Sequence, residues 1–184
     1  MINYTNLVNK NTPVIVQIGA HDGILGEEYG LQELLDNLDD FRLILIEPID
    51  KFFDNLESVY GKYGNKVEYI KVAISEVNGK VNMLDQGCMS KIDNSGHILV
   101  DSITWDKLLI DNNIDKIDLL LLDCEGYEFN ILNQINFSEI KPPVIRYEYY
   151  WIPNKEECDS YLISNGYKIE LCEYDHISNK IAYL

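Results

Sequence analysis

A short run of β-branched residues followed by glycines, close to the N-terminus, constrains the fold of this chain more than any other stretch. Residues 14–18 read Val-Ile-Val-Gln-Ile, and Gly19 and Gly23 bound the turn that follows. A continuous apolar run of this length is typical of a strand buried on both faces of a sheet. Glycines directly after such a strand permit positive φ and let a ligand approach the backbone. The stretch therefore indicates the first strand of an α/β sheet that faces a nucleotide-like cofactor, although an ordinary strand-to-helix turn has the same pattern.

Strand-like and helix-like patterns alternate along the rest of the chain. From the spacing of apolar residues, helices are predicted over 25–38, 50–60, 105–111, 126–135 and 154–164. Further strands are predicted over 41–46, 67–74, 117–122 and 144–147. A terminal pair of strands, 167–173 and 177–183, has a short connection that favours an antiparallel hairpin. The alternation predicts a doubly wound, mainly parallel α/β sheet that ends in this hairpin.

The chain carries no repeats, low-complexity tracts or linkers, so we expect one domain over residues 1–184. Residues 1–12 are polar and are expected to form a loose arm or a short docking helix. Residues 75–103 are less regular and are interpreted as an insertion. Within it, Asn78-Gly79 predicts a hairpin turn, short strands are expected near 80–84 and 98–102, and residues 87–96 are expected to form a mobile surface loop.

The composition of the chain limits the kinds of partner that it can bind. The chain has 15 basic and 31 acidic residues, a formal net charge of -16, which repels phosphate backbones and argues against nucleic acid. No apolar run approaches the roughly 20 residues of a membrane span, and no secretory signal is present, so we expect no membrane partner and a cytoplasmic location. The four cysteines lack zinc or redox spacing, and Cys124 and Cys172 are expected to be small core residues.

Polar residues follow the predicted strands where each strand ends. They are Gly19–Gly23, Glu47, residues 73–76, residues 123–126 and Glu148. In doubly wound sheets, ligands bind outside the carboxyl ends of the strands, where the strand order reverses. Three of the five positions bring a carboxylate to this edge. A single charge at a strand end is usually just solvated, but the convergence of three favours a site.

The spacing of the glycines indicates the kind of cofactor. Glu47 follows Gly23 by 24 residues, at the end of the second strand, where an acid can accept hydrogen bonds from both ribose hydroxyls. The glycines at 19, 23 and 26 lack the G-x-G-x-x-G spacing that lets a pyrophosphate approach a helix N-terminus. A ribose-bearing cofactor without pyrophosphate, such as S-adenosylmethionine, fits better than a dinucleotide.

Five short motifs occur in order within residues 13 to 150. They are Ile18–Gly23, Ile46-Glu47-Pro48, Val72–Ser75 with Gly79, Ser102–Asp106 and Leu122–Glu128. Together they resemble the FkbM family of class I, S-adenosylmethionine-dependent methyltransferases, which have a Rossmann-like fold. Members mostly methylate hydroxyl oxygens, often on sugars or other small natural products.

The resemblance implies that the first glycine turn lines the methionine and ribose part of the cofactor, that Glu47 binds the ribose, and that residues 72–74 lie near the adenine. The candidate cofactor-binding residues are Gln17, Gly19, Ala20, His21, Gly23, Glu47, Pro48, Ala73, Ile74 and Asp123. It also places Asp123 and Glu125 at the reacting edge. Two positions depart from the family pattern, because Gln17 stands where an acid is usual and His21 where Asn is common. Gln17 can hydrogen-bond, but it offers no charge to the cofactor's ammonium group.

Transfer to a hydroxyl needs a proton acceptor within hydrogen-bond reach. The candidate catalytic residues are Asp123, Glu125 and His21. The candidate substrate-binding residues are Glu148, Tyr149, Trp151 and Ser90. Several carboxylates at one edge can hold Mg²⁺, but the sequence has no ligand series at regular spacing, so we predict no metal centre from it.

Three functions are compatible with these patterns. The leading hypothesis is an S-adenosylmethionine-dependent O-methyltransferase that acts on a hydroxyl of a small acceptor such as a carbohydrate. The second, motivated by Gln17 and the short chain, is a methyltransferase fold without catalysis that binds a ligand or serves in a complex. The third is a nicotinamide-dependent oxidoreductase, against which the glycine spacing argues.

Overall fold

The computed structural model describes residues 1–24 and 30–184. Part of the helix expected over 25–38 therefore lies outside the described residues. The remainder forms α1, Leu31–Asp36. None of the helices in the described part of the chain is both long and apolar enough to cross a bilayer.

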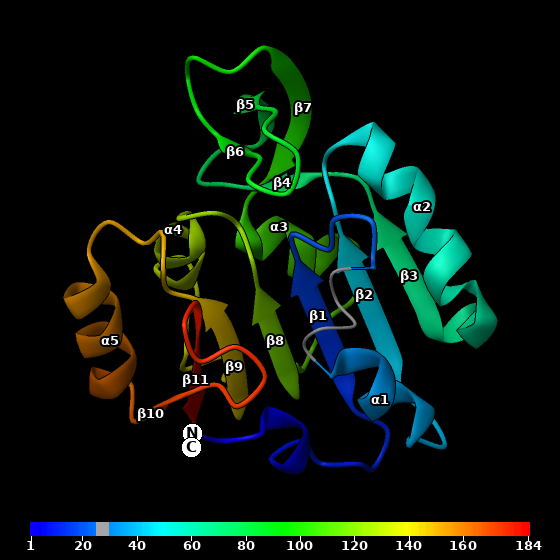
Figure 1. The fold of residues 1–184 in the computed structure, drawn as a ribbon, viewed down its shortest axis with the longest axis vertical. Coiled ribbons are helices and arrows are strands. Elements are labelled where there is room, and N and C mark those ends of the chain that lie inside the picture. Colours follow the sequence, from blue (N-terminus) through cyan, green and yellow to red (C-terminus); the bar gives the residue numbers. More distant parts are fainter. Residues whose placement is uncertain (25–29) are drawn as a thin grey trace.

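The described strands build one large sheet and one small sheet (Figure 1). The large sheet has the order β10-β11-β9-β8-β1-β2-β3. Its strands are β1 Val14–Ile18, β2 Arg42–Ile46, β3 Val67–Ile70, β8 Leu119–Leu122, β9 Val144–Glu148, β10 Lys168–Leu171 and β11 Asn179–Tyr183. The five neighbouring strands β9, β8, β1, β2 and β3 pair in parallel. Strand β11 pairs antiparallel with β9 on one side and with β10 on the other. The prediction of a mainly parallel sheet with a terminal antiparallel hairpin is confirmed.

The central strands are apolar on both faces because helices cover both. Ile15 of β1 packs with α1 and with α2, Asp50–Tyr60, in one buried cluster. Its neighbour Val16 faces the other cluster, with α3, Trp105–Asp111, α4, Glu128–Leu132, and α5, Lys155–Ser164. Successive side chains of a strand point to opposite faces, so most positions of a strand between two helical layers are apolar.

The N-terminal segment docks onto the first of these faces. Tyr4 and Val8 are buried there beside α1 and α2. Ile2 pairs with Cys172, and residues Tyr4–Asn6 form a short 3-10 helix, η1. Of the two expectations for residues 1–12, the short docked helix is the one that the structure shows.

The small sheet lies beyond the carboxyl ends of the parallel strands, above their arrowheads in Figure 1. Its order is β4-β7-β5-β6, with β4 Ala73–Ile74, β5 Gly79–Leu84, β6 Lys91–Ile92 and β7 Ile98–Ile103. The expected strand over 67–74 is wrong as a single strand. It ends at Ile70, and Ala73–Ile74 leaves the large sheet to pair with β7.

Two further expectations for residues 75–103 are wrong. Asn78-Gly79 does not close a hairpin, because β4 and β5 lie on opposite sides of β7 and do not pair with each other. Instead, Asn78 Oδ1 accepts a hydrogen bond from the Thr104 N–H at 3.0 Å. The segment expected to be only a surface loop, 87–96, contributes β6, which pairs with β5.

Candidate active site

The turn after β1 lies against the end of β8. Gly19 has φ +80°, and a Cβ atom on it would lie 1.8 Å from the carbonyl oxygen of Asp123. The N–H groups of Gly19 and Ala20 both donate to the carbonyl oxygen of Ile46, each at 3.0 Å. The turn is therefore held between the ends of β2 and β8, at the place where the strand order reverses.

A second turn, Asp123–Gly126, follows β8 and is shaped by Glu128. The buried Glu128 carboxylate accepts hydrogen bonds from the N–H of Cys124 at 2.6 Å and from the N–H of Gly126 at 3.0 Å. Glu125 and Gly126 both have positive φ, +53° and +100°. Because Gly126 cannot be helical in this conformation, α4 begins at Glu128 and is shorter than the predicted 126–135.

A cavity of about 260 Å³ opens between the strand ends and the small sheet. Most of the residues that the sequence singles out line it: Gln17, Gly19, Ala20, His21, Glu47, Pro48, Ala73, Ile74, Ser90, Asp123, Glu125 and Glu148. Cys124 also lines the cavity, whereas Cys172 is buried in the core as expected. The glycine turn, the acidic turn and the small sheet thus enclose one site.

Three of the singled-out residues do not line this cavity. A Cβ atom on Gly23 would lie 2.8 Å from the ring of Tyr60, so this glycine allows the turn to pack against α2. The backbone of Trp151 packs against Gly126, and its side chain is exposed. Tyr149 lies under the ammonium group of Lys180, 4.6 Å from its ring centroid.

The sequence interpretation missed several lining residues. Phe52 of α2 stacks on His21, with ring centroids 3.7 Å apart and an angle of 33° between the rings. Phe52 lies on the apolar stripe of α2, and this spacing does not distinguish a residue that lines a cavity from one that packs in the core. The small sheet adds Met83, Lys91 and Ile92, whose role depends on a strand arrangement that local patterns do not encode.

Glu47 is already ordered by the backbone around it. Its Oε2 accepts from the N–H of His21 at 3.0 Å, and its Oε1 accepts from the N–H of Ile49 at 2.8 Å. Burial raises the pKa of Glu47 to about 7, although the two N–H donors act in the opposite direction. Each carboxylate oxygen keeps a second lone pair, so Glu47 can still accept hydrogen bonds from a ligand.

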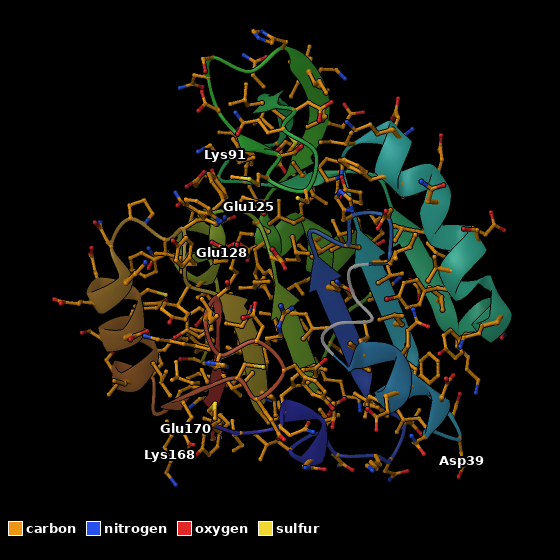
Figure 2. All side chains as sticks on the ribbon, viewed as in Figure 1. Asp39, Lys91, Glu125, Glu128, Lys168 and Glu170 are labelled. Carbon is orange, nitrogen blue, oxygen red and sulfur yellow. The ribbon has the colours of Figure 1, made fainter. Side chains whose placement is uncertain are left out.

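Three carboxylates that line the cavity lie close to one another. One oxygen each of Asp123, Glu125 and Glu148 lies within 4.8 Å of the others. Burial, with the nearby carboxylates, raises the pKa of Glu125 to about 7 and that of Glu148 to about 9. Burial also raises the pKa of Asp123, against the opposing effect of the buried Arg146, whose Nη2 lies 3.7 Å from Asp123 Oδ2. Figure 2 shows Glu125 and Lys91 in the region between the two sheets.

Gln17 faces the same cavity from β1. Its side chain is 5% exposed, and its Oε1 has no hydrogen-bond partner among the described residues. A buried amide oxygen without a partner is costly, so this atom is suited to accept a hydrogen bond from a bound ligand. The ammonium group of S-adenosylmethionine is a donor of the required kind.

This sheet order, with a cavity at the switch point between β1 and β8, defines the class I S-adenosylmethionine-dependent methyltransferase fold. Residues 17–169 match the methyltransferase FkbM domain, and the chain belongs to the FkbM family of methyltransferases. The protein is therefore an S-adenosylmethionine-dependent methyltransferase. This decides against the nicotinamide-dependent alternative.

Solved structures share the fold at low sequence identity. The precorrin-6y C5,15-methyltransferase of Geobacter metallireducens is 11% identical with a TM-score of 0.56, over 94% of this chain and 80% of that one. The O-methyltransferase TomG of Streptomyces achromogenes, in complex with S-adenosylmethionine, is 12% identical with a TM-score of 0.54, over 95% and 74%. Fibrillarin of Aeropyrum pernix, with natively bound S-adenosylmethionine, is 10% identical with a TM-score of 0.54, over 93% and 65%. A comparison with curated proteins finds no match.

Proposed function

We propose that this methyltransferase transfers the methyl group of S-adenosylmethionine to a hydroxyl oxygen of a small polar acceptor of the carbohydrate type. The observation that carries the proposal is the group of carboxylates, Asp123, Glu125 and Glu148, at one wall of the cavity. A hydroxyl becomes a nucleophile when a neighbouring group accepts its proton. The FkbM family match and the O-methyltransferase TomG among the structures of the same fold support this choice.

The cofactor is assigned to the half of the cavity formed by the ends of β1 and β2. There the turn at Gly19 lets the backbone approach the ligand, and Gln17 Oε1 accepts from the ammonium group. Glu47 accepts from the ribose hydroxyls, and the apolar residues 72–74 take the adenine. When bound, S-adenosylmethionine supplies an electrophilic methyl group on its sulfonium. His21 closes this half of the cavity, since its ring is stacked on the ring of Phe52 and its backbone N–H donates a hydrogen bond to the Glu47 carboxylate.

The acceptor is assigned to the half of the cavity lined by Asp123, Glu125, Glu148 and Ser90. Asp123 or Glu125 takes the proton of the reacting hydroxyl, and Glu148 and Ser90 hold neighbouring polar groups of the acceptor. Tyr149 and Trp151 are not assigned to the acceptor, because they lie outside the cavity. Holding acceptor and methyl group in line supplies a large part of the rate enhancement in such a displacement.

The proposal is tested in two steps. Calorimetry with S-adenosylhomocysteine measures cofactor binding, and transfer of labelled methyl groups to a panel of sugars, aglycone alcohols, amines and thiols measures the acceptor class. We expect binding, and transfer to hydroxyl acceptors that Asp123→Asn and Glu125→Gln lower by about 100-fold or more. The exposed Glu170, at the opposite end of the molecule in Figure 2, provides the control Glu170→Gln. Transfer confined to amines or thiols would contradict the proposal.

A further inference from the structure

We propose that Lys91 binds an anionic group of the acceptor, a carboxylate or a phosphate, so that the acceptor is an acidic carbohydrate and not a neutral one. This role of Lys91 rests on the proposed function, since it names the acceptor class of the same site. Lys91 is the first residue of β6 and lines the cavity from the small sheet. Figure 2 shows it in the region between the two sheets, where Glu125 of the acidic turn also lies.

Lys91 differs from most lysines of the chain in having no ion-pair partner. No carboxylate among the described residues lies within 4.0 Å of its ammonium group. Eight other lysines form ion pairs with aspartates within this distance. Lys141, Lys155 and Lys168 instead lie over aromatic rings. In a chain with 31 acidic and 15 basic residues, a lysine that lines a cavity without such a partner is suited to pair with an anion that enters the cavity.

The two carboxylates whose charges act together with Lys91 leave its ammonium group available. Asp93 Oδ1 accepts hydrogen bonds from the N–H and the hydroxyl of Ser95, at 2.8 and 2.6 Å. Burial, with the charge of Asp123, raises the pKa of Glu125 to about 7, although Lys91 acts in the opposite direction. Glu125 is therefore only partly ionised at neutral pH. A fully charged carboxylate or phosphate on a ligand is the stronger partner for an ammonium group.

The carboxylates of the cavity repel an anion less than their number suggests. Burial, with the nearby carboxylates, raises the pKa of Glu148 to about 9, so its carboxyl group is protonated at neutral pH. Its Oε2 is buried and has no hydrogen-bond partner among the described residues. A protonated carboxyl group can donate a hydrogen bond to an anionic oxygen. Asp123 has the guanidinium of Arg146 beside it, with Nη2 3.7 Å from Oδ2. One negative charge near Lys91 is thus compatible with this lining.

The turn before β6 fixes the backbone from which Lys91 extends. Ser90 Oγ donates a hydrogen bond to the carbonyl oxygen of Gly87 at 2.6 Å, which closes the turn. Asp85, in the same turn, accepts two hydrogen bonds of 2.7 Å from Lys51 Nζ of α2. This contact ties the small sheet to a helix of the large one, and β6 itself pairs with β5. An anchor whose backbone is already ordered loses less conformational entropy when it binds a ligand.

The position of Lys91 assigns it to the acceptor and not to the cofactor. The proposed cofactor half is formed by the ends of β1 and β2 with residues 72–74, whereas Lys91 belongs to the small sheet and its charge acts on Glu125. An anionic group held at Lys91 leaves the hydroxyl groups of the acceptor to Asp123 and Glu125. Holding the acceptor at a second point restricts its orientation, which favours transfer to one particular hydroxyl.

The test uses the full chain with S-adenosylmethionine that carries a labelled methyl group. The acceptors are matched pairs that differ in charge: glucuronate with glucose, galacturonate with galactose, and a hexose phosphate with its hexose. We expect kcat/KM to be higher for the anionic member by about 10-fold or more, and Lys91→Met to make the two members nearly equal. Lys91→Arg should keep most of the preference, since it keeps the charge. The exposed Lys168, at the opposite end of the molecule in Figure 2, provides the control Lys168→Met.

Two outcomes would overturn the role of Lys91: neutral acceptors that are methylated as well as the anionic ones, or a preference for anions that survives in Lys91→Met. Either result leaves methyl transfer to hydroxyl groups standing. Loss of S-adenosylhomocysteine affinity in Lys91→Met, with the acceptor preference unchanged, would instead assign Lys91 to the carboxylate of the cofactor.

A binding measurement tests Lys91 even if none of these pairs is methylated. Calorimetry of glucuronate with the S-adenosylhomocysteine complex should show saturable binding that is about 10-fold weaker in Lys91→Met. Absence of such binding, or equal binding by the two proteins, would refute the anion site. Binding without any methyl transfer would support the anion site and count against the proposed function.

Discussion

The carboxylate of Glu128 lies 2.6 Å from the backbone nitrogen of Cys124, at the point where β8 ends and the acidic turn begins. Its second oxygen accepts from Gly126. We expect Glu128→Gln to lower the free energy of unfolding by about 1–3 kcal/mol, because the new amide nitrogen would face one of these N–H donors. Urea denaturation measures this change. The exposed change Glu170→Gln should stay within about 0.5 kcal/mol. Equal stability of the two variants would show that Glu128 does not hold the turn.

A side chain at position 19 has no room. We expect Gly19→Ala to destabilise the protein by about 3 kcal/mol or more, because the new Cβ meets the Asp123 carbonyl at 1.8 Å and the residue keeps a positive φ. Gly166→Ala is the matched control, since φ is +89° and the nearest atom is the flexible Lys141 Nζ at 3.4 Å. Only left-handed strain, about 1–2 kcal/mol, should appear there. Thermal or urea unfolding of both variants gives the comparison, and a smaller loss at Gly19 than at Gly166 would refute it.

Cofactor affinity should depend on pH through Glu47. The pKa of this carboxyl in the free protein is raised to about 7, and the ribose hydroxyls are proposed to donate to its charged form. Binding then favours the deprotonated state, so affinity for S-adenosylhomocysteine should be full above pH 7 and fall as the pH drops below it. Calorimetry across this range measures the effect. Glu47→Gln should bind about 10-fold more weakly at pH 8 and lose the dependence. A slope that persists in this variant would assign the titration to another group.

Arg146 is fully buried beside Asp123, so we expect the removal of either charge to lower the stability of the fold. Arg146→Met should cost about 2–3 kcal/mol of stability at neutral pH, because it leaves the partly buried Asp123 carboxylate, 23% exposed, without the neighbouring guanidinium. Adding Asp123→Asn should recover part of that loss. A double-mutant cycle in urea measures the coupling. Additive losses would show that the two groups do not interact.

The parts of the fold that are predictable from the sequence depend on local pattern. Val14–Ile18 and Asp50–Tyr60 are found with the predicted bounds. The continuous apolar run of the strand and the apolar stripe of the helix are both patterns of residues close together in the sequence. The strand over 67–74 was misjudged because its second part pairs with β7, a partner about 30 residues away. The Asn78-Gly79 signal failed for the same reason. A turn preference specifies a reversal of the chain, not which strands become neighbours.

The sequence predicts those residues of the candidate site whose position follows from the order and direction of the strands. Gly19, Ala20, Glu47 and Asp123 line the cavity as expected. Each of them lies in a segment that directly follows a parallel strand. Tyr149 and Trp151 do not line the cavity, because β9 ends at Glu148 and aromatic character alone does not indicate where a side chain beyond the strand points. Phe52 was missed because a stacking surface and a core residue have the same helical spacing. Arg146 gave no signal, since a charge within a strand is only meaningful once its carboxylate partner is located.

The two walls of the cavity come from separate stretches of the chain. The cofactor half proposed above is formed by the ends of β1 and β2 together with residues 72–74, whereas Met83, Lys91 and Ile92 come from β5 and β6 of the small sheet. Substitutions on the small sheet can reshape one half of the chamber while the hydrogen bonds that hold the other half stay intact. Under the proposed assignment of the two halves, libraries that aim at new acceptors are best confined to residues 79–103, because changes there leave the hydrogen bonds around Glu47 and Gly19 in place.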